Sequence, residues 1–477
     1  NAAVDFIAET NTAMGTIRNS SPALTVLGGS QNAMARFARS SNAIGQFIGL
    51  PTSLRTIADS EVGMSALAEN SSAITAIAAN SNAMDSIRES TVGMGVLAES
   101  VNGMTIVAAS NTAMSRIAAS ATPVNVLRNS ARAMGIIAAS SNAVTNLAAS
   151  STAMDSIRQS ELAVGALGDS ATAMNIIATS TTAMTSLAAS STAMDVLRNK
   201  TVAMPIVANA SNAVNRIIAS TTALNSIQSS QTAMDAMGAS TVAMPLFAAS
   251  SAAMSILAES SNTMTRWAAS NNAINTLNAS TTAWPILVAS QNAMNILPTN
   301  TVARTAIFNR AYAIARVRES KMALGKFVVG YTDLLPTNYA NVDVVLADPV
   351  ALNKVAASQQ AISTLAGSSL IAPSIVSNPD IMNIFASSAE ARQALYAQPV
   401  TIEMIVSSDP ATAKLVAGFA GIDPRTVGSV AALLANTGSI IAVGASDEAS
   451  SILSGNSAAN TIIRSTPTVY NAIAQTE

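Results

Sequence analysis

Two residue types are missing from this chain of 477 residues, which has no cysteine and no histidine. Without cysteine it can form no disulfide and offers no thiolate to a metal, which suits a protein that works outside cells or meets variable redox conditions. Without histidine it lacks the commonest general base and the commonest transition-metal ligand. The sequence therefore predicts no enzyme, with no catalytic, cofactor-binding or metal-ligating residues and no cofactor.

Charged and aromatic side chains are also scarce, at 10% and 3% of the chain. The 24 basic and 26 acidic residues form no basic stripe, so we expect no nucleic-acid partner. No apolar run approaches the length of a membrane span, since even residues 430–445 are interrupted by Asn436 and Gly444. No secretory signal is visible, and the chain begins inside a repeat, so we expect a processed product or a piece of a longer protein.

What the chain does have is a ten-residue repeat. Residues 1–300 divide into thirty blocks without insertion or deletion, such as STAMDSIRQS (151–160) and STAMDVLRNK (191–200). Apolar residues stand at positions three, four, seven and eight of the block, which is one face of a helix and not the alternation of a strand. Position four is most often Met and position three is most often Ala.

Position ten marks where helices begin and end. It is Ser in twenty-three of the thirty blocks, and Ser caps helix N-termini by accepting a hydrogen bond from a free backbone N–H. Pro51, Pro349 and Pro379 directly follow this position or its later equivalents, and proline is favoured as the first residue of a helix. Each Ser is therefore predicted to end one helix and to cap the next.

A single long helix does not explain the pattern. With 100° per residue, the apolar face would move by about 80° in each block, and no ordinary supercoil absorbs such a drift. We instead expect about two helical turns per block, followed by a sharp corner. Helices this short are unstable alone and must bury their Ala/Met/Ile face against neighbouring blocks. The predicted fold is an all-α solenoid.

Weaker marks suggest roughly four blocks per superhelical turn. Arg occupies position eight in five blocks, with gaps of seven, four, three and four blocks. Glycine or proline recurs at position five about every four blocks, at Gly15, Gly45, Gly95, Gly135, Gly165, Pro205, Pro245 and Pro285. We expect one side of the solenoid to differ from the others once per turn.

Residues with chemical potential have simple structural interpretations. Asp85/Arg88, Asp155/Arg158 and Asp195/Arg198 are three apart and predict solvated salt bridges, with a repeated ligand-binding row as the less favoured alternative. Trp267, Trp284 and the Met row occupy predicted core positions. No P-loop or dinucleotide fingerprint is present, and Ser without His forms no ordinary nucleophile–base pair.

The register breaks once. Residues 1–330 are predicted to form the decapeptide solenoid, and residues 331–347 an irregular insertion, taken as a loop with a short Val-rich strand. Residues 348–477 carry degenerate helical repeats. Since terminal repeats are usually atypical, we expect this part to be a capping or docking module.

The block S-T/N-A-M-x-x-I-A-x-S resembles the decapeptide arrays of virion proteins of tailed bacteriophages, which are described as tail-fibre or tail proteins. The resemblance covers residues 1–330 strictly and the remainder loosely. It implies a structural virion component, a fibre, whisker or decoration acting as an elongated scaffold or spacer. Other virion proteins, a second copy of the chain and a host surface are the partners it implies.

Two alternatives remain open at the level of sequence. The first is a secreted bacterial adhesin or surface-filament subunit, located at the cell surface instead of the virion and binding through its polar Ser/Thr/Asn face. The second, an ice- or polysaccharide-binding surface, is less favoured because the Ser and Thr positions fall at helix starts and not in a flat array.

Overall fold

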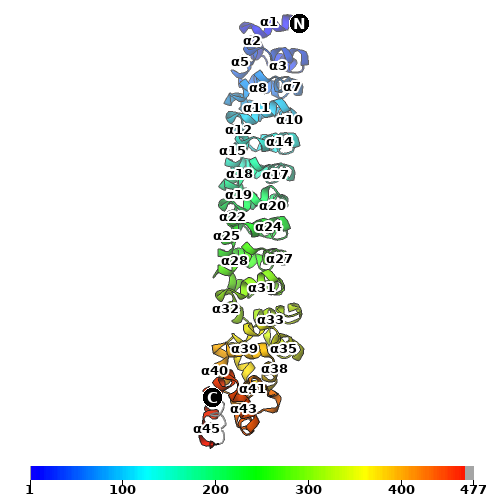
Figure 1. The fold of residues 1–477 in the computed structure, drawn as a ribbon. Helices are drawn as coiled ribbons and strands as arrows, with labels where there is room; N and C mark the ends of the chain where they lie inside the picture. Colours follow the sequence, from blue (N-terminus) through cyan, green and yellow to red (C-terminus); the bar gives the residue numbers. More distant parts are fainter. Residues whose placement is uncertain (1, 468–477) are drawn as a thin grey trace. The chain divides into compact units, whose positions relative to one another are not determined.

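The computed structural model describes residues 2–467, and in this part of the chain it contains α-helices, three short 3-10 helices and no strands. Most helices are seven to nine residues long and follow one another at ten-residue intervals (Figure 1). The predicted all-α solenoid of short helices is confirmed. The chain divides into two compact units, Asn1–Phe247 and Ala248–Glu477.

The helices of the first unit are α1 (Ala2–Glu9), α2 (Asn11–Arg18), α3 (Ser21–Gly28), α4 (Gln31–Phe37), α5 (Ser41–Ile48), α6 (Pro51–Ala58), α7 (Glu61–Glu69), α8 (Ser71–Ala78), α9 (Ser81–Arg88), α10 (Thr91–Glu99), α11 (Val101–Ala109), α12 (Asn111–Ala118), α13 (Ala121–Leu127), α14 (Ala131–Ala139), α15 (Ser141–Ala149), α16 (Ser151–Ile157), α17 (Glu161–Gly168), α18 (Ala171–Thr179), α19 (Thr181–Ala188), α20 (Ser191–Leu197), α21 (Ala203–Ala208), α22 (Ser211–Ile218), α23 (Thr221–Ile227) and α24 (Gln231–Ala239). The next helix, α25 (Ala243–Ala249), spans the division between the units.

The helices of the second unit are α26 (Ser251–Leu257), α27 (Ser261–Ala269), α28 (Asn271–Ala279), α29 (Ala283–Leu287), α30 (Gln291–Ile296), η1 (Leu297–Thr299), α31 (Thr301–Phe308), α32 (Ala311–Arg318), α33 (Lys321–Gly330), η2 (Pro336–Asn338), α34 (Val342–Leu346), α35 (Pro349–Ala356), α36 (Gln359–Ala366), α37 (Ala372–Ser377), α38 (Pro379–Ser387), α39 (Ala389–Tyr396), α40 (Pro399–Val406), α41 (Asp409–Phe419), η3 (Pro424–Thr426), α42 (Val430–Leu434), α43 (Thr437–Gly444), α44 (Asp447–Gly455) and α45 (Ser457–Ser465).

Each corner is a single extended residue. Ser100 has φ −82° and ψ 112°, so it ends α10 and at the same time caps α11, accepting a hydrogen bond from the Gly103 N–H at 3.0 Å. The two helices meet at an angle of 101°. The expected role of position ten is therefore confirmed for most of the serines, although Ser120 makes no side-chain cap. The predicted helix starts at Pro51, Pro349 and Pro379 are confirmed as well.

Three helices, and not four, complete one turn of the solenoid. Each helix packs most closely against its third neighbour, as α6 does on α9, α12 on α15 and α14 on α17, with weaker contacts to the fourth neighbour. An eight-residue helix is about 12 Å long. A triangle of such helices is filled by the side chains of positions four and seven, whereas a square would enclose an unfilled channel. The prediction of roughly four blocks per turn is wrong.

The marks that suggested four blocks do not report on the stacking. Gly and Pro at position five lie on the outer surface, exposed or half-buried, so they are not constrained by the core. With three blocks per turn, the position-eight arginines occupy all three columns of stacked helices, at Arg88, at Arg128 and Arg158, and at Arg18 and Arg198. These arginines therefore do not distinguish one side of the solenoid from the others, contrary to the expectation from the sequence.

The core follows the predicted positions. Ala at three, the apolar residue at four and the apolar residue at seven are buried in nearly every block, and the rows of methionine lie at the centre. Trp267 and Trp284 are 0% exposed, so both tryptophans are core residues as expected. The small residue at position three is needed because a Cβ added to Gly93 would lie 2.9 Å from the Ala58 carbonyl oxygen of the preceding turn.

The region after α33 departs from the regular turn. The Val-rich run predicted as a short strand is the helix α34, and that prediction is wrong. The Asn341 side chain accepts hydrogen bonds from the N–H groups of Asp343 and Val344, and this cap overrides the strand preference of valine. The division at residues 247 and 248 falls within the regular repeat, so the expected domains 1–330, 331–347 and 348–477 stay a prediction.

No single helix among residues 2–467 is both long and apolar enough to cross a membrane. Two consecutive pairs, α10 with α11 and α17 with α18, reach the required length and composition only together, and each pair is bent by 101°.

Removing a corner hydroxyl should destabilise the stack. Ser90 is buried and makes both a cap and a bond to the preceding turn, so S90A should lower the free energy of unfolding by about 1–3 kcal/mol. The control S81A changes an exposed serine at position one and should shift it by less than about 0.5 kcal/mol. Urea denaturation of the full chain measures both, and equal effects would contradict the assignment.

Candidate functional site: polar clamps between turns and an outer groove

The corner serines form a row of clamps between successive turns. Ser90 Oγ accepts a hydrogen bond from the Gly93 N–H at 2.9 Å and donates one to the Ala58 carbonyl at 3.0 Å, 32 residues earlier. One hydroxyl thus caps the start of its own helix and satisfies a free carbonyl at the end of the helix below. The same 32-residue bond is made by Ser40, Ser60, Ser100, Ser110, Ser130, Ser140, Ser150, Ser160, Ser170, Ser180, Ser190, Ser220, Ser230 and Ser240.

Sequence reasoning missed this second bond, although a signal for it exists. Asp caps helices as well as Ser does, yet no block in residues 1–300 has Asp at position ten. A carboxylate cannot donate to the carbonyl of the preceding turn and would be repelled by it, whereas a hydroxyl accepts and donates at once. Asn at position two adds a second donor to the same carbonyls, as between Asn102 Nδ2 and the Ala68 oxygen at 2.7 Å.

The three predicted Asp/Arg pairs are present, with closest approaches of 2.9 Å for Asp85–Arg88, 3.1 Å for Asp155–Arg158 and 3.4 Å for Asp195–Arg198. They also join turns, which the sequence did not reveal. Arg88 Nη1 donates to the Arg116 carbonyl at 2.8 Å, and Arg198 Nη1 to the Ser226 carbonyl at 2.9 Å. These arginines therefore clamp a helix end to the next turn.

The Asp85 carboxylate is the most strongly held of these acids. A hydrogen bond from the Arg116 guanidinium, aided by the charges of Arg88 and Arg116, holds its pKa below the ordinary value despite partial burial. The cluster contains one acid between two bases and no unpaired nucleophile. It can therefore join turns electrostatically, and it offers no general base in the sense used for catalysis.

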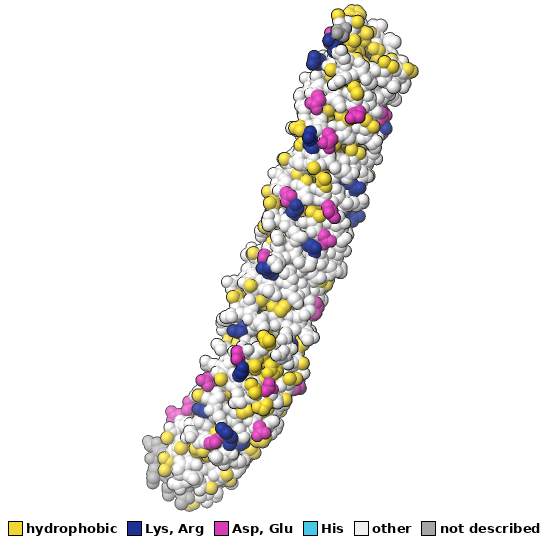
Figure 2. Space-filling view, turned by 90° about the vertical axis from the view of Figure 1, so that its right-hand side faces the viewer, with side chains coloured by type: hydrophobic (Ala, Val, Ile, Leu, Met, Phe, Trp, Pro, Cys, Tyr) yellow, Lys and Arg dark blue, Asp and Glu magenta, His cyan; other side chains and the backbone are white. Residues whose placement is uncertain are grey.

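No metal-binding cluster of three or more acidic residues occurs between residues 2 and 467. Figure 2 shows a face on which basic and acidic side chains lie beside one another in scattered pairs. The expectation that the chain has no catalytic, cofactor-binding or metal-ligating residues stays a prediction.

The first unit carries an open groove along its outer surface. One part, of about 440 Å³, lies between α4 and α7, and the next, of about 470 Å³, lies between α7 and α10. Its lining combines small residues at position five, valines, three glutamates and one arginine, namely Ala35, Ser65, Gly95, Val62, Val92, Glu61, Glu69, Glu99 and Arg39. Sequence reasoning did not find it, because residues thirty apart form each part. Its chemistry suits a partner segment with small apolar and basic side chains.

Asn278 is a polar residue at a position where most blocks have Ala. It is 2% exposed, and neither atom of its amide has a hydrogen-bond partner within the described residues. The corner residue of the following turn is Arg310, which makes no side-chain cap. A buried amide without partners costs free energy that the consensus Ala would avoid.

Replacing this amide should stabilise the second unit. We expect N278A to raise the free energy of unfolding by about 1–2 kcal/mol more than the control N275A, which changes an exposed asparagine of the same helix. Both changes gain the same helix propensity, so their difference isolates the buried amide. Thermal unfolding compares the two, and an N278A variant less stable than N275A would show that Asn278 is satisfied.

Tyr331 lies at the end of α33, beneath Arg304, whose guanidinium carbon is 5.5 Å from the ring centroid, and edge-on to Phe308 at 5.9 Å. Burial raises the pKa of Tyr331 to about 12, and the Thr364 side chain and the charges of Arg304 and Arg318 oppose this rise only partly. The phenol is therefore kept neutral by its surroundings and has no base beside it to activate it.

The raised pKa predicts a loss of stability at alkaline pH. Between the ordinary pKa of 10.0 and the folded value of about 12, the unfolded chain releases the Tyr331 proton and the folded chain keeps it. The contribution of Tyr331 to the free energy of unfolding is therefore fully present below pH 10. It is lost as the pH rises through this window, which lowers the free energy of unfolding by about 1–3 kcal/mol. Y331F should remove this part of the loss, which urea denaturation at pH 9 to 12 measures. Parallel curves for both proteins would contradict the burial of Tyr331.

No protein-family model matches the chain, and no curated protein matches it significantly.

Proposed function

We propose that the chain is a structural component of the virion of a tailed bacteriophage, a fibre, whisker or decoration that acts as a scaffold or spacer. The observation that carries the proposal is the repetition of one contact. In the first unit the serine–carbonyl bond recurs at a 32-residue separation from Ser40 to Ser240. A structure made of equivalent turns keeps its cross-section while it gains length, which is what a spacer requires.

The dimensions agree with this use. The helices α1–α24 make eight turns of three, and helices pack 8–10 Å apart, so the first unit spans on the order of 70 Å along its own axis. Each turn contacts only its neighbours, so stability grows with the number of turns and needs no large globular core. The repeat motif of virion proteins that the chain resembles supports the same location.

Partners would bind the outer surface of the stack. With 10% charged residues, that surface is mostly Ser, Thr and Asn. The groove between α4, α7 and α10 is a hollow of the first unit that is lined by apolar side chains and carboxylates. We propose other virion proteins or a second copy of the chain as its partners. The groove also favours the second candidate function, a secreted adhesin or surface-filament subunit that contacts another cell.

Fractionation separates the two functions. Particles from the source culture are banded in a density gradient, washed in high salt and analysed by mass spectrometry of peptides. We expect peptides of this chain in the particle band at a constant ratio to capsid and tail proteins. Recovery of the chain only from the cell envelope or the particle-free supernatant would contradict the virion proposal and favour the adhesin. A secreted host protein of known abundance serves as the control for contamination.

A further inference from the structure

The second unit contains the same sequence of elements twice, displaced by 88 residues. Thr301–Phe308 (α31) corresponds to Ala389–Tyr396 (α39), and Ala311–Arg318 (α32) to Pro399–Val406 (α40), each beginning and ending 88 residues later. The same displacement relates η2 to η3, α34 to α42 and α35 to α43 at both ends. The correspondence therefore runs from residues 291–366 to residues 379–454.

The contacts repeat with the elements. Arg304 lies over Tyr331 at 5.5 Å, and Arg392 lies over Phe419 at 5.6 Å. The edge-on ring pair Phe308–Tyr331, at 5.9 Å, returns as Tyr396–Phe419 at 6.0 Å. Ser368 Oγ donates to the Arg318 carbonyl at 2.6 Å, and 88 residues later Asn456 Nδ2 donates to the Val406 carbonyl at 2.8 Å. Two copies of one arrangement explain these pairs, and chance does not.

Each copy accommodates additional chain in one turn. In the regular solenoid equivalent helices begin 30 residues apart, but α36 begins 38 residues after α33, and α44 begins 38 residues after α41. The helices still stack, because α33 packs on α36 and α41 packs on α44. The additional residues form the segments between α33 and α34 and between α41 and α42, which contain η2 and η3.

A buried lysine holds each of these segments. Lys326 is 1% exposed, and its Nζ donates to Asn295 Oδ1 at 2.6 Å and to the Pro336 carbonyl of η2 at 3.0 Å. Lys414 is 6% exposed, and its Nζ donates to Asn383 Oδ1 at 2.7 Å and to the Pro424 carbonyl of η3 at 3.2 Å. A third acceptor, the Val427 carbonyl, lies 3.2 Å from the Lys414 nitrogen.

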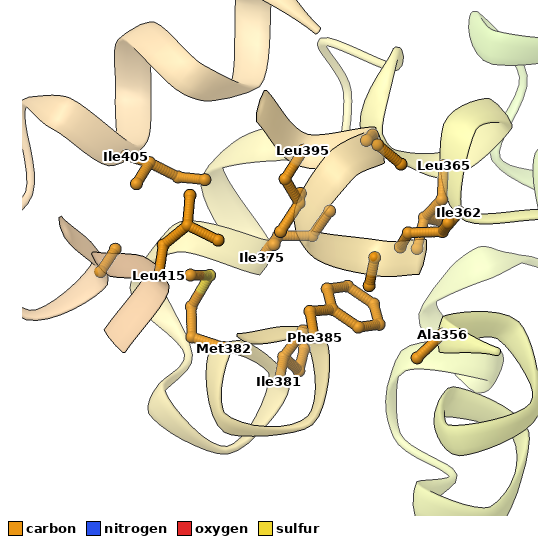
Figure 3. Close-up of a cluster of buried hydrophobic side chains, with 14 of the residues drawn as sticks. Ala356, Ile362, Leu365, Ile375, Ile381, Met382, Phe385, Leu395, Ile405 and Leu415 are labelled. Carbon is orange, nitrogen blue, oxygen red and sulfur yellow. The ribbon is translucent and has the colours of Figure 1, made fainter. Parts of the chain in front are cut away.

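The acceptor set around Lys414 matches the charged form of its amine. An ammonium group has three N–H donors and no acceptor, and around Lys414 three oxygens face it. A buried cation is costly unless such oxygens replace its water. In the surrounding core, Figure 3 shows Leu415, the neighbour of Lys414 on α41, pointing toward Met382, the neighbour of Asn383 on α38.

The two copies share their interior and differ at their tips. Lys, Asn and Pro of the lysine site are identical in both, as are Arg304/Arg392 and Gly330/Gly418. The exposed positions of the segments differ, with Asp333, Leu335 and Thr337 in the first copy where the second has Gly421, Asp423 and Arg425. The shared residues are therefore those that build the module, and the tips have no common binding chemistry.

We propose that residues 291–366 and 379–454 are two copies of one structural module, and that in each copy the buried lysine ammonium fastens the additional segment to the stack. The lysine acts as a positioning residue, joining the side-chain amide of an asparagine on a neighbouring helix to the proline carbonyl of the inserted 3-10 turn. The module lets the solenoid change the length of one turn without losing the contacts on either side of it.

The test uses the full chain, and each copy serves as the control for the other. K326M keeps an unbranched side chain, one atom shorter than that of lysine, and leaves the two acceptors without a donor. Hydrogen–deuterium exchange in residues 331–347 should become at least about tenfold faster, while exchange in residues 419–435 should stay unchanged. K414M should do the reverse. The matched control K354M removes a half-buried surface lysine that bonds Asp333 of the same segment at 2.7 Å, and should change exchange by less than about threefold.

Two further measurements keep the proposal testable if a lysine variant does not fold. N295A removes one acceptor and should accelerate exchange in residues 331–347 to a smaller extent. In the unaltered chain, ¹⁵N NMR should detect two lysine ammonium groups whose protons exchange slowly with water. Unchanged exchange in K326M, or the absence of slow ammonium signals, would overturn the proposal. So would an intact mass lower by one ammonia per pair, since it would mean that lysine and asparagine have condensed to an amide.

Discussion

The whole structure depends on satisfying the ends of very short helices. A helix leaves four N–H groups and four carbonyl groups without intrahelical partners, so an eight-residue helix consists almost entirely of ends. The hydroxyl of the corner serine satisfies one group of each kind. As Ser90 shows, it accepts a hydrogen bond from an N–H of the helix that it starts and donates one to a carbonyl of the preceding turn. Local structure and stacking are thereby coupled, because the same hydroxyl makes the local cap and the bond that forms only when the turns have met.

Packing between the turns follows from the close approach of backbones that the serine bond imposes. The serine clamp brings backbone against backbone, so position three holds only small or compact residues, and the interior is filled from positions four and seven. Methionine suits this interior because its unbranched side chain adapts to the irregular spaces between short helices. The two tryptophans show that a turn also accommodates a much larger residue when its neighbours allow it.

Much of this could be read from the sequence, because the relevant signals are local. Ser or Pro at a block boundary acts on the adjacent helix, and the apolar face is contained in ten residues, so helix limits and core positions were predictable. The number of blocks per turn was not, since it depends on the 101° bend and on contacts between residues about thirty apart. The strand expected at residues 342–346 failed because one residue outside it, Asn341, decides the conformation.

The least predictable part lies in the second unit. The two lysine sites are built from residues scattered over segments of more than forty residues, and the exposed positions between them have diverged. A ten-residue period hides an 88-residue one, because the shorter pattern accounts for most of the similarity. Only the recurrence of the same contacts at the same separation distinguishes the longer period.

The 32-residue serine bond also determines how such a chain can change in size. Removal of thirty residues would take out one whole turn, return every later block to the same column, and leave all outward surfaces aligned. Removal of ten would preserve each bond in kind but rotate everything downstream by a third of a revolution. The length of the chain can therefore change by multiples of three blocks without disturbing a binding surface that extends over more than one turn.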